Sequence, residues 1–188
     1  MFLTGPSGAG KTTILKILFG WEHYEEGQVL VQGINVGRLD AGNIHTLRRS
    51  MGVIFQDYKL LPNKTVFENV AFAQEVTNRD RKKIKFKTWE ALKNVGLTPK
   101  KDSFPAQLSG GEQQRVAIAR AMVNTPPIIL ADEPTGTLDQ EISSEILKLF
   151  EEINRNGATI VFATHSQEIL KPGKHRVIVL NRGKVVSS

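Results

Sequence analysis

The chain has 188 residues, 40% of them hydrophobic and 23% charged, which fits one soluble globular domain and excludes a fibrous or disordered protein. Cysteine is absent, which excludes disulfide frameworks and cysteine-based metal or nucleophile chemistry, and no apolar run exceeds four residues, which excludes a membrane-spanning helix and a signal peptide. The net charge of +6 predicts an anionic partner, and the protein is expected in the cytoplasm or at the cytoplasmic face of a membrane.

The excess positive charge is confined to one segment. From Arg79 to Asp102 there are nine basic and three acidic residues, so this segment carries a net charge of +6. The other 16 basic and 16 acidic residues of the chain cancel. Two interpretations stay open: Arg79–Lys101 docks on an anionic leaflet, or it is a solvated basic helix face.

Five short apolar runs, each followed by a polar or glycine-rich loop, predict strands. Continuous rather than alternating runs are typical of strands buried on both faces of a parallel sheet. They lie at Phe2–Thr4, Gly52–Phe55, Ile128–Ala131, Thr159–Ala163 and Val177–Leu180. Between the first two runs, the sequence predicts a helix at Thr12–Phe19, closed by Gly20, and a hairpin of Gln28–Gln32 and Ile34–Val36 around Gly33. Strands that alternate with helices predict an α/β domain.

The middle of the chain is predicted to be helical. Helices are expected at Thr65–Val76, in the basic stretch up to Val95, and at Gly110–Val123. We therefore expect residues 65–123 to form a helical insertion in an α/β core.

Residues 5–12 match the phosphate-loop pattern G-x-x-x-x-G-K-[ST] at every fixed position. The match follows a predicted strand and opens a predicted helix, which is the context that this motif requires. Backbone N–H groups of such a loop surround phosphate oxygens, and the helix N-terminus adds a favourable partial charge. Lys11 would reach the β- and γ-phosphates, and the Thr12 hydroxyl would ligate Mg²⁺.

Two acidic residues, Asp132 and Glu133, end the predicted strand that starts at Ile128. Ligands of open α/β sheets bind beyond the carboxyl ends of the strands, so Asp132 is placed to hold Mg²⁺ and Glu133 to polarise an attacking water. Adjacent acids at a strand end can also simply begin a loop. The phosphate loop in the same chain favours the catalytic interpretation.

A second helix start has features of an anion site. Ser109 and Glu112 have the spacing of a capping box, and Gly110 and Gly111 follow Ser109 although glycine is unfavourable in a helix. The two glycines favour close approach of the backbone to a ligand. Because one phosphate loop already surrounds a triphosphate, the sequence predicts that this helix start contacts the γ-phosphate of a partner subunit.

These three motifs, in this order, resemble the nucleotide-binding domain of ABC-type ATPases. Three further motifs fit the same family: Phe55-Gln56-Asp57 resembles its Q-loop, Thr137-Leu138-Asp139 its D-loop, and Ala163-Thr164-His165 the strand end that carries its switch histidine. The resemblance implies a P-loop NTPase fold with a RecA-like, mostly parallel sheet in residues 1–64 and 124–188 and a helical subdomain in residues 65–123.

The resemblance also implies a mechanism. Two subunits would close head-to-tail around two ATP molecules and Mg²⁺. Glu133, His165 and Gln56 would be catalytic, Mg²⁺ would be held by Thr12, Gln56 and Asp132, and contacts across the dimer would come from Ser109, Gly110, Gly111, Glu112 and Asp139. ATP would be bound by Gly5, Pro6, Ser7, Gly8, Ala9, Gly10, Lys11, Thr12 and Thr13.

The chain departs from the family pattern in three places. Thr137 stands where relatives usually carry Asn, and Ser166 stands where Asp is usual. Relatives have about two dozen more residues before the phosphate-loop strand, which supply antiparallel strands and an aromatic ring that stacks on adenine. We therefore expect those antiparallel strands to be partly missing, and no aromatic residue of this sequence is assigned to the adenine.

The stretch from Phe55 to Val70 is similar to the cell-division branch of the family, the FtsE-like ATPases. This implies a peripheral protein on the cytoplasmic face of the inner membrane, paired with an integral FtsX-like subunit. ATPases of lipoprotein-releasing or macrolide-type exporters are the alternative within the family. A DNA-associated ABC ATPase would carry a long coiled coil between Lys11 and Leu108, which the sequence lacks, so no nucleic acid is expected. A non-hydrolysing, ATP-dependent scaffold stays open.

Overall fold

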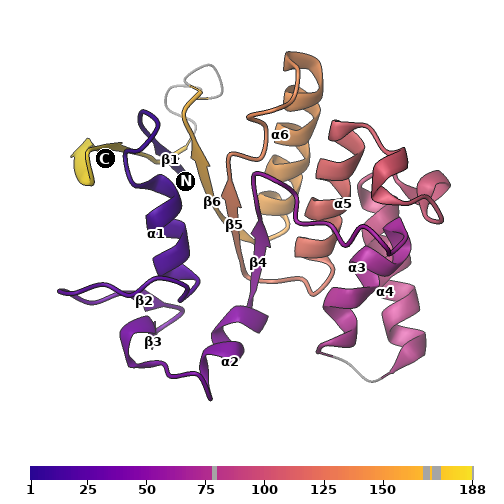
Figure 1. Ribbon diagram of the computed structural model, residues 1–188, viewed down its shortest axis with the longest axis horizontal. Coiled ribbons are helices and arrows are strands. Elements are labelled where there is room, and N and C mark those ends of the chain that lie inside the picture. The colour runs from indigo at the N-terminus through magenta and orange to yellow at the C-terminus, as the bar shows by residue number, and fades with distance from the viewer. Residues whose placement is uncertain (78–79, 167–169, 171–174, 188) are drawn as a thin grey trace.

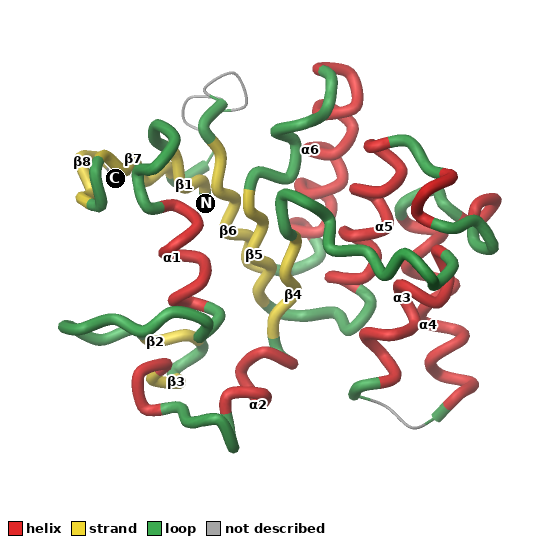
Figure 2. The backbone as a smooth tube through the Cα atoms, viewed as in Figure 1, coloured by secondary structure: helices red, strands yellow, loops and turns green. Residues whose placement is uncertain are grey.

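The computed structural model describes residues 1–77, 80–166, 170 and 175–187. A six-stranded sheet with the strand order β4-β5-β6-β1-β7-β8 runs through its centre (Figures 1 and 2). The first five of these strands are parallel, and β8 pairs antiparallel with β7 at one edge. The strands are β1 (Phe2–Thr4), β4 (Met51–Ile54), β5 (Ile128–Asp132), β6 (Thr159–Thr164), β7 (Val177–Asn181) and β8 (Lys184–Ser187).

All five predicted strands of the sheet are present, with ends shifted by one residue at most. The burial of β4, β5 and β6 is nearly continuous, as expected for parallel strands that are covered on both faces. The sequence prediction missed β8, whose residues are all exposed and therefore give no apolar run. The turn between β7 and β8 places Arg182 and Gly183 at positive φ, which is a hairpin geometry.

Two hydrophobic clusters lie on the two faces of the sheet. Leu130 and Val161 face the cluster that contains Leu15 of α1 (Lys11–Leu18) and Leu47 of α2 (Ile44–Arg49). The neighbouring residues of β5 and β6 face the other cluster, which contains the buried side of α6 (Gln140–Arg155) and much of the helical part. This alternation along each strand fixes which helices cover which face. A short hairpin of β2 (Leu30–Val31) and β3 (Ile34–Asn35) lies below α1 in Figure 1.

The helical part stands to the right of β4 in Figure 1. It consists of α3 (Val66–Glu75), α4 (Arg81–Asn94) and α5 (Gly110–Met122), which pack against one another, so the three predicted helices are confirmed. Side-chain caps start all three: Thr65 and Glu68 form a capping box on α3, Asp80 accepts two N–H groups of α4, and Ser109 and Glu112 form a capping box on α5. Single 3₁₀ turns lie at Val36–Arg38, Thr98–Lys100 and Pro105–Gln107.

Two helices, α2 and α6, were not predicted. The sequence did carry a signal for α6, because its buried residues recur at helical spacing: Ile146, Leu149, Phe150 and Ile153. The six residues of α2 are too few to show such a period.

Gly52 is the point at which β4 meets the end of α5. A Cβ atom at this position would lie 2.5 Å from the backbone oxygen of Ala121 and 3.2 Å from Pro126. We expect Gly52→Ala to lower the free energy of unfolding by about 1–3 kcal/mol, because the strand and the helix would have to separate. Urea denaturation measures this change. Gly42→Ala is the control, since Gly42 is exposed and a Cβ atom there would lie 3.2 Å from a side-chain oxygen of Asp40 and not against backbone, so its effect should be clearly smaller than that of Gly52→Ala. Equal unfolding midpoints for both variants would contradict the close contact at Gly52.

Candidate functional site

Four of the predicted motifs follow four neighbouring strands. Because β4, β5, β6 and β1 are adjacent and parallel, their carboxyl ends lie at the same edge of the sheet. The loops at this edge carry the phosphate loop after β1, Gln56 after β4, Glu133 after β5 and His165 after β6. The sheet order therefore brings together residues that are up to 160 positions apart, since it places Gly5 and His165 at the same edge.

The phosphate loop is shaped by backbone conformations that favour glycine. Gly5, Gly8 and Gly10 all have positive φ, and a Cβ atom on Gly5 would lie 2.1 Å from the backbone oxygen of Leu180. Helix α1 begins directly after Gly10, so its free N–H groups point to the loop. The loop therefore has the concave backbone and the helix N-terminus that bind phosphate.

Lys11 lies at the centre of this loop. Its side chain is 7% exposed, and Nζ donates hydrogen bonds to the backbone oxygens of Gly5 at 2.9 Å and Pro6 at 3.2 Å. The same Nζ forms an ion pair with Oε1 of Glu133 at 3.5 Å. A nearly buried ammonium whose partners among the described residues are two carbonyls and one carboxylate is placed to receive the negative charge of a phosphate.

Glu133 connects Lys11 to His165. Oε2 of Glu133 lies 2.9 Å from Nδ1 of His165 and accepts a hydrogen bond from the His165 backbone N–H at 3.3 Å. The φ of Glu133 is 45°, a left-handed conformation that is uncommon for a residue other than glycine and occurs often at functional sites. The three side chains Lys11, Glu133 and His165 thus form one polar chain across the carboxyl ends of β1, β5 and β6.

Thr12 and Asp132 offer oxygen atoms beside this chain. The Thr12 hydroxyl donates a hydrogen bond to Oδ1 of Asp132 at 3.2 Å. Burial raises the pKa of Asp132, and the nearby Glu133 carboxylate adds to this shift, while the Thr12 hydrogen bond and two lysine charges oppose it. A hydroxyl and a carboxylate that converge in this way fit Mg²⁺, which prefers oxygen ligands, and a bound cation would favour the charged form of Asp132.

Gln56 lies at the same edge, but it is not engaged with the polar chain. It is exposed in the loop after β4, and its side chain makes no hydrogen bond to any described residue. Gln56 is therefore free to contact a ligand that enters between β4 and β5.

The second predicted anion site lies apart from the phosphate loop. Ser109–Glu112 opens α5 in the helical part of the molecule, whereas the phosphate loop opens α1 (Figure 1). A contact within the chain explains why position 111 is a glycine: a Cβ atom there would lie 2.8 Å from Cγ2 of Ile142 on α6. Gly111 therefore permits close packing of two helices, and the second glycine alone is no sign of a ligand. Gly110 is exposed, and a Cβ atom there would meet nothing closer than 3.5 Å.

Asp139 caps α6, where its Oδ1 accepts a hydrogen bond from the Ile142 N–H at 2.9 Å. The segment before it, residues 134–138, leads from Glu133 to this cap. Thr137 in this segment lies 3.0 Å from the Tyr58 hydroxyl, and Arg120 of α5 holds the backbone of Tyr58. Tyr58 and Arg120 were not among the predicted site residues, and their only signal in the sequence is that they lie close to the predicted motifs.

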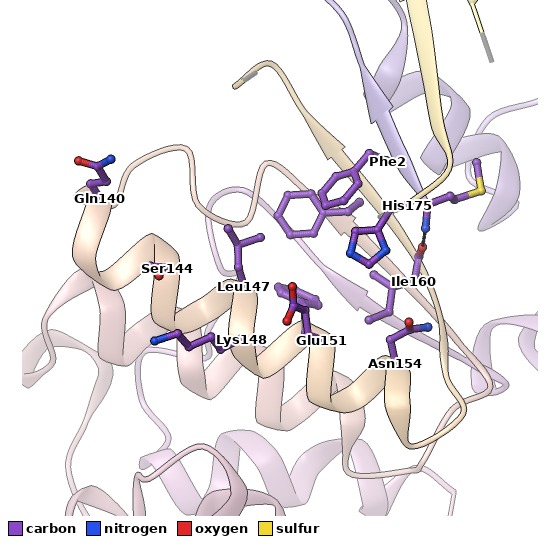
Figure 3. Close-up of a pocket in the computed structure, with 12 residues that line it drawn as sticks. Phe2, Gln140, Ser144, Leu147, Lys148, Glu151, Asn154, Ile160 and His175 are labelled. Carbon is purple, nitrogen blue, oxygen red and sulfur yellow. Dashed lines mark hydrogen bonds between the residues drawn. The ribbon is translucent and has the colours of Figure 1, made fainter. Parts of the chain in front are cut away.

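A cavity of about 380 Å³ lies elsewhere, between one side of α6 and the sheet (Figure 3). Phe2 and Ile160 line it from the sheet, and Leu147, Lys148 and Glu151 line it from α6. None of the residues predicted to bind nucleotide lines this cavity.

Comparison with known proteins decides the family. Residues 1–136 match the family model described as ABC transporter. The chain belongs to the ABC transporter family. Its structure is also similar to that of the ATP-binding cassette MJ0796, solved as a dimer in a post-hydrolysis state bound to ADP and Pi. The TM-score is 0.89, and the two sequences are 38% identical over 99% of this chain and 82% of the MJ0796 chain. The predicted α/β fold of a P-loop NTPase is thereby confirmed.

The chain is also similar to curated proteins named cell division ATP-binding protein FtsE. It is 50% identical to the one from Streptococcus pneumoniae over 185 residues, which are 98% of this chain and 80% of the relative. It is 48% identical to the one from Bacillus subtilis, over 99% of this chain and 82% of the relative. It is 47% identical to the one from Escherichia coli, over 97% and 82%.

The raised pKa of Asp132 predicts how the stability of the ligand-free protein depends on pH. A carboxyl whose pKa is higher in the folded state than in the unfolded state binds its proton more tightly in the folded state. Its contribution to the free energy of unfolding is therefore largest at low pH and is lost as the pH rises through the folded pKa. We expect Asp132→Asn to melt at a higher temperature than the wild type at pH 7 without Mg²⁺ or nucleotide. The difference should shrink as the pH falls and Asp132 takes up its proton.

Thermal unfolding from neutral to acid pH measures this effect. Asp102→Asn is the control, because the Asp102 side chain is 79% exposed. A lower melting temperature for Asp132→Asn at pH 7 would contradict the prediction.

Proposed function

We propose that the protein binds ATP with Mg²⁺ and hydrolyses it to ADP and phosphate as the ATP-binding subunit of an ABC-type membrane complex. The observation that carries this proposal is the polar chain of Lys11, Glu133 and His165 beside the Thr12–Asp132 pair. Phosphate binding, metal ligands and a general base all meet at one edge of the sheet, as phosphoryl transfer requires.

The residue roles follow from this arrangement. The loop of Gly5–Thr13 binds the phosphates, and Lys11 leaves its carbonyl partners to neutralise the β- and γ-phosphates. Thr12, Asp132 and Gln56 would hold Mg²⁺, which neutralises charge that develops on the phosphate oxygens. Glu133 orients a water and accepts its proton as the water oxygen attacks the γ-phosphorus and the bond to the β–γ bridging oxygen breaks. His165 holds the carboxylate of Glu133 and contacts the γ-phosphate.

We further propose that the active form is a head-to-tail dimer. In this dimer Ser109, Gly110 and Glu112 face the nucleotide of the partner, with Gly111 supporting the helix start and Asp139 at the seam. The exposed start of α5 supports this proposal, as does the dimeric state of the similar solved cassette. We also propose that residues 65–123 act as a helical subdomain on a core of residues 1–64 and 124–188.

The cellular role is proposed to be cell division, because the curated relatives at 47–50% identity are named for it. The partner would be an integral FtsX-like membrane subunit, and the protein would lie at the cytoplasmic face of the inner membrane. No helix among the described residues is long and apolar enough to cross a bilayer. The ATPase subunit of a lipoprotein-releasing or macrolide-type exporter is the second candidate, because it shares the motif at Gln107–Val116.

Replacement of Glu133 tests the enzymatic proposal. We expect Glu133→Gln to lower the rate of phosphate release by about 10²–10⁴-fold, because an amide cannot accept the proton of the attacking water. Binding of ATP should persist, since Lys11 and the loop are unchanged. A steady-state phosphate-release assay and ATP binding by equilibrium dialysis measure the two effects.

Glu75→Gln is the matched control, because Glu75 is an exposed carboxylate in the last turn of α3. Phosphate release should equal that of the wild type. Equal release by wild type and Glu133→Gln would refute the catalytic role of Glu133, and ATP binding without hydrolysis in the wild type would favour a scaffold.

The basic segment offers a surface for the membrane. Helix α4 exposes Lys82, Lys83 and Lys85, and Phe86 and Trp89 are 63% and 43% exposed on the same helix. Arg79, the first residue of the predicted segment, lies outside the described residues. Lysines beside exposed aromatic rings are typical of surfaces that bind an anionic membrane interface. We propose that α4 contacts the anionic leaflet when the complex assembles.

Neutralisation of four lysines tests this contact. Each basic residue near an anionic leaflet contributes about 1 kcal/mol, so replacing Lys82, Lys83, Lys85 and Lys87 by Gln should weaken binding to vesicles with anionic lipid by up to about 10³-fold. Co-sedimentation with phosphatidylglycerol vesicles measures the change. The control replaces four lysines on other elements, Lys16, Lys59, Lys148 and Lys184. Unchanged sedimentation of the α4 variant would show that the segment is only a solvated helix face.

A further inference from the structure

Tyr58 joins two loops that the sequence motifs treat as separate. Its hydroxyl lies 3.0 Å from Oγ1 of Thr137, and the two residues are 79 positions apart. Thr137 belongs to the D-loop motif of residues 137–139, so this hydrogen bond links that motif to the loop after β4.

The backbone around Tyr58 is held in a strained turn. Tyr58 and Lys59 have φ values of 58° and 49°, which are unfavourable for residues with a side chain, and two such residues in succession need external support. Arg120 of α5 supplies this support, because its guanidinium donates to the backbone oxygens of Tyr58 and Lys59, both at 2.7 Å. Burial lowers the pKa of Arg120, and its two carbonyl partners compensate the buried charge.

This contact lies between the groups proposed to act on ATP. Gln56 precedes Tyr58 by two residues, and Thr137 lies in the segment between Glu133 and Asp139. Gly110, at the start of α5, faces the same point: a Cβ atom there would lie 3.5 Å from the Tyr58 hydroxyl and 3.6 Å from Leu138. The Tyr58 side chain therefore contacts Thr137 of the D-loop and lies near the start of α5.

We infer that Tyr58 is a positioning residue. Its hydroxyl fixes residues 134–139, which contain the D-loop motif Thr137–Asp139, relative to residues 55–59, which contain the Q-loop motif Phe55–Asp57. Arg120 ties the same turn to α5, so a displacement of the helical part reaches the D-loop through Tyr58 and Thr137. The inference rests on the proposed ATPase function for its role in turnover, whereas the mechanical link is a property of the ligand-free chain.

A double-mutant cycle in the ligand-free protein tests the link. Tyr58→Phe and Thr137→Val each remove one hydroxyl and keep the bulk of the side chain. Hydrogen exchange is followed at the Tyr58 amide, which bonds to the Phe55 oxygen, and at the Gly136 and Leu138 amides, which bond within the D-loop. Loss of one neutral hydrogen bond predicts exchange that is about 2- to 10-fold faster. Each substitution should speed exchange in both loops, and the double variant should be no faster than either single variant.

Turnover provides the functional readout. We expect Tyr58→Phe and Thr137→Val to lower kcat for ATP by about 2- to 10-fold and to leave KM unchanged, because neither side chain contacts the nucleotide in the proposed site. Thr137→Ser keeps a hydroxyl and should restore kcat. Tyr24→Phe is the matched control, since Tyr24 is the only other tyrosine and its hydroxyl bonds to Asn35 and the Val29 N–H in the hairpin region.

The outcomes separate the possibilities. Two results would contradict coupling of the two loops by the Tyr58–Thr137 hydrogen bond. One is faster exchange only in the loop that carries the substitution, and the other is exchange in the double variant that is faster than in either single variant. A fall in kcat that Tyr24→Phe shares would also overturn it, because it would reflect general loss of structure. A wild-type protein without ATP hydrolysis would refute the proposed function, and the exchange cycle would still decide whether Tyr58 couples the two loops.

Discussion

The structure of the site depends on the adjacency of four parallel strands. Because β4, β5, β6 and β1 are neighbours with the same direction, the residues that follow them lie side by side. This adjacency places Lys11, Glu133 and His165 in one chain of polar contacts. Both faces of this sheet are packed by hydrophobic clusters, which fixes the register of the strands and therefore the spacing of the functional groups.

In the ligand-free site, the ammonium group of Lys11 already has partners within the protein. Lys11 occupies the centre of the loop with two carbonyls and the Glu133 carboxylate as partners. A phosphate that enters must replace these partners, and it leaves Glu133 without its cation. Glu133 keeps the hydrogen bond that it accepts from the His165 backbone N–H. Under the proposed function, an entering phosphate and the Glu133 carboxylate therefore compete for one ammonium group.

Much of this site could be predicted from the sequence, because its chemistry depends on local patterns. The loop at Gly5–Thr12, the acids after β5 and the capping box at Ser109 are all short motifs, and the structure has them in the predicted local context. The roles of Tyr58 and Arg120 could not be predicted, because they depend on contacts between segments about 60 to 80 positions apart. Strand β8 was not predicted, because all its residues are exposed and it therefore shows no apolar pattern.

Gly111 illustrates how one sequence signal can have two physical causes. Two glycines at a helix start predict close approach of something to the backbone, and the structure shows that for Gly111 this is Ile142 of α6. The missing side chain lets the starts of α5 and α6 pack together, with Leu138 beside Gly110. The surface proposed to face the second nucleotide therefore contacts the first turn of α6, which Asp139 caps. The two contacts proposed across the dimer are thus neighbours within one subunit, because a single close approach at Gly111 brings the two helix starts together.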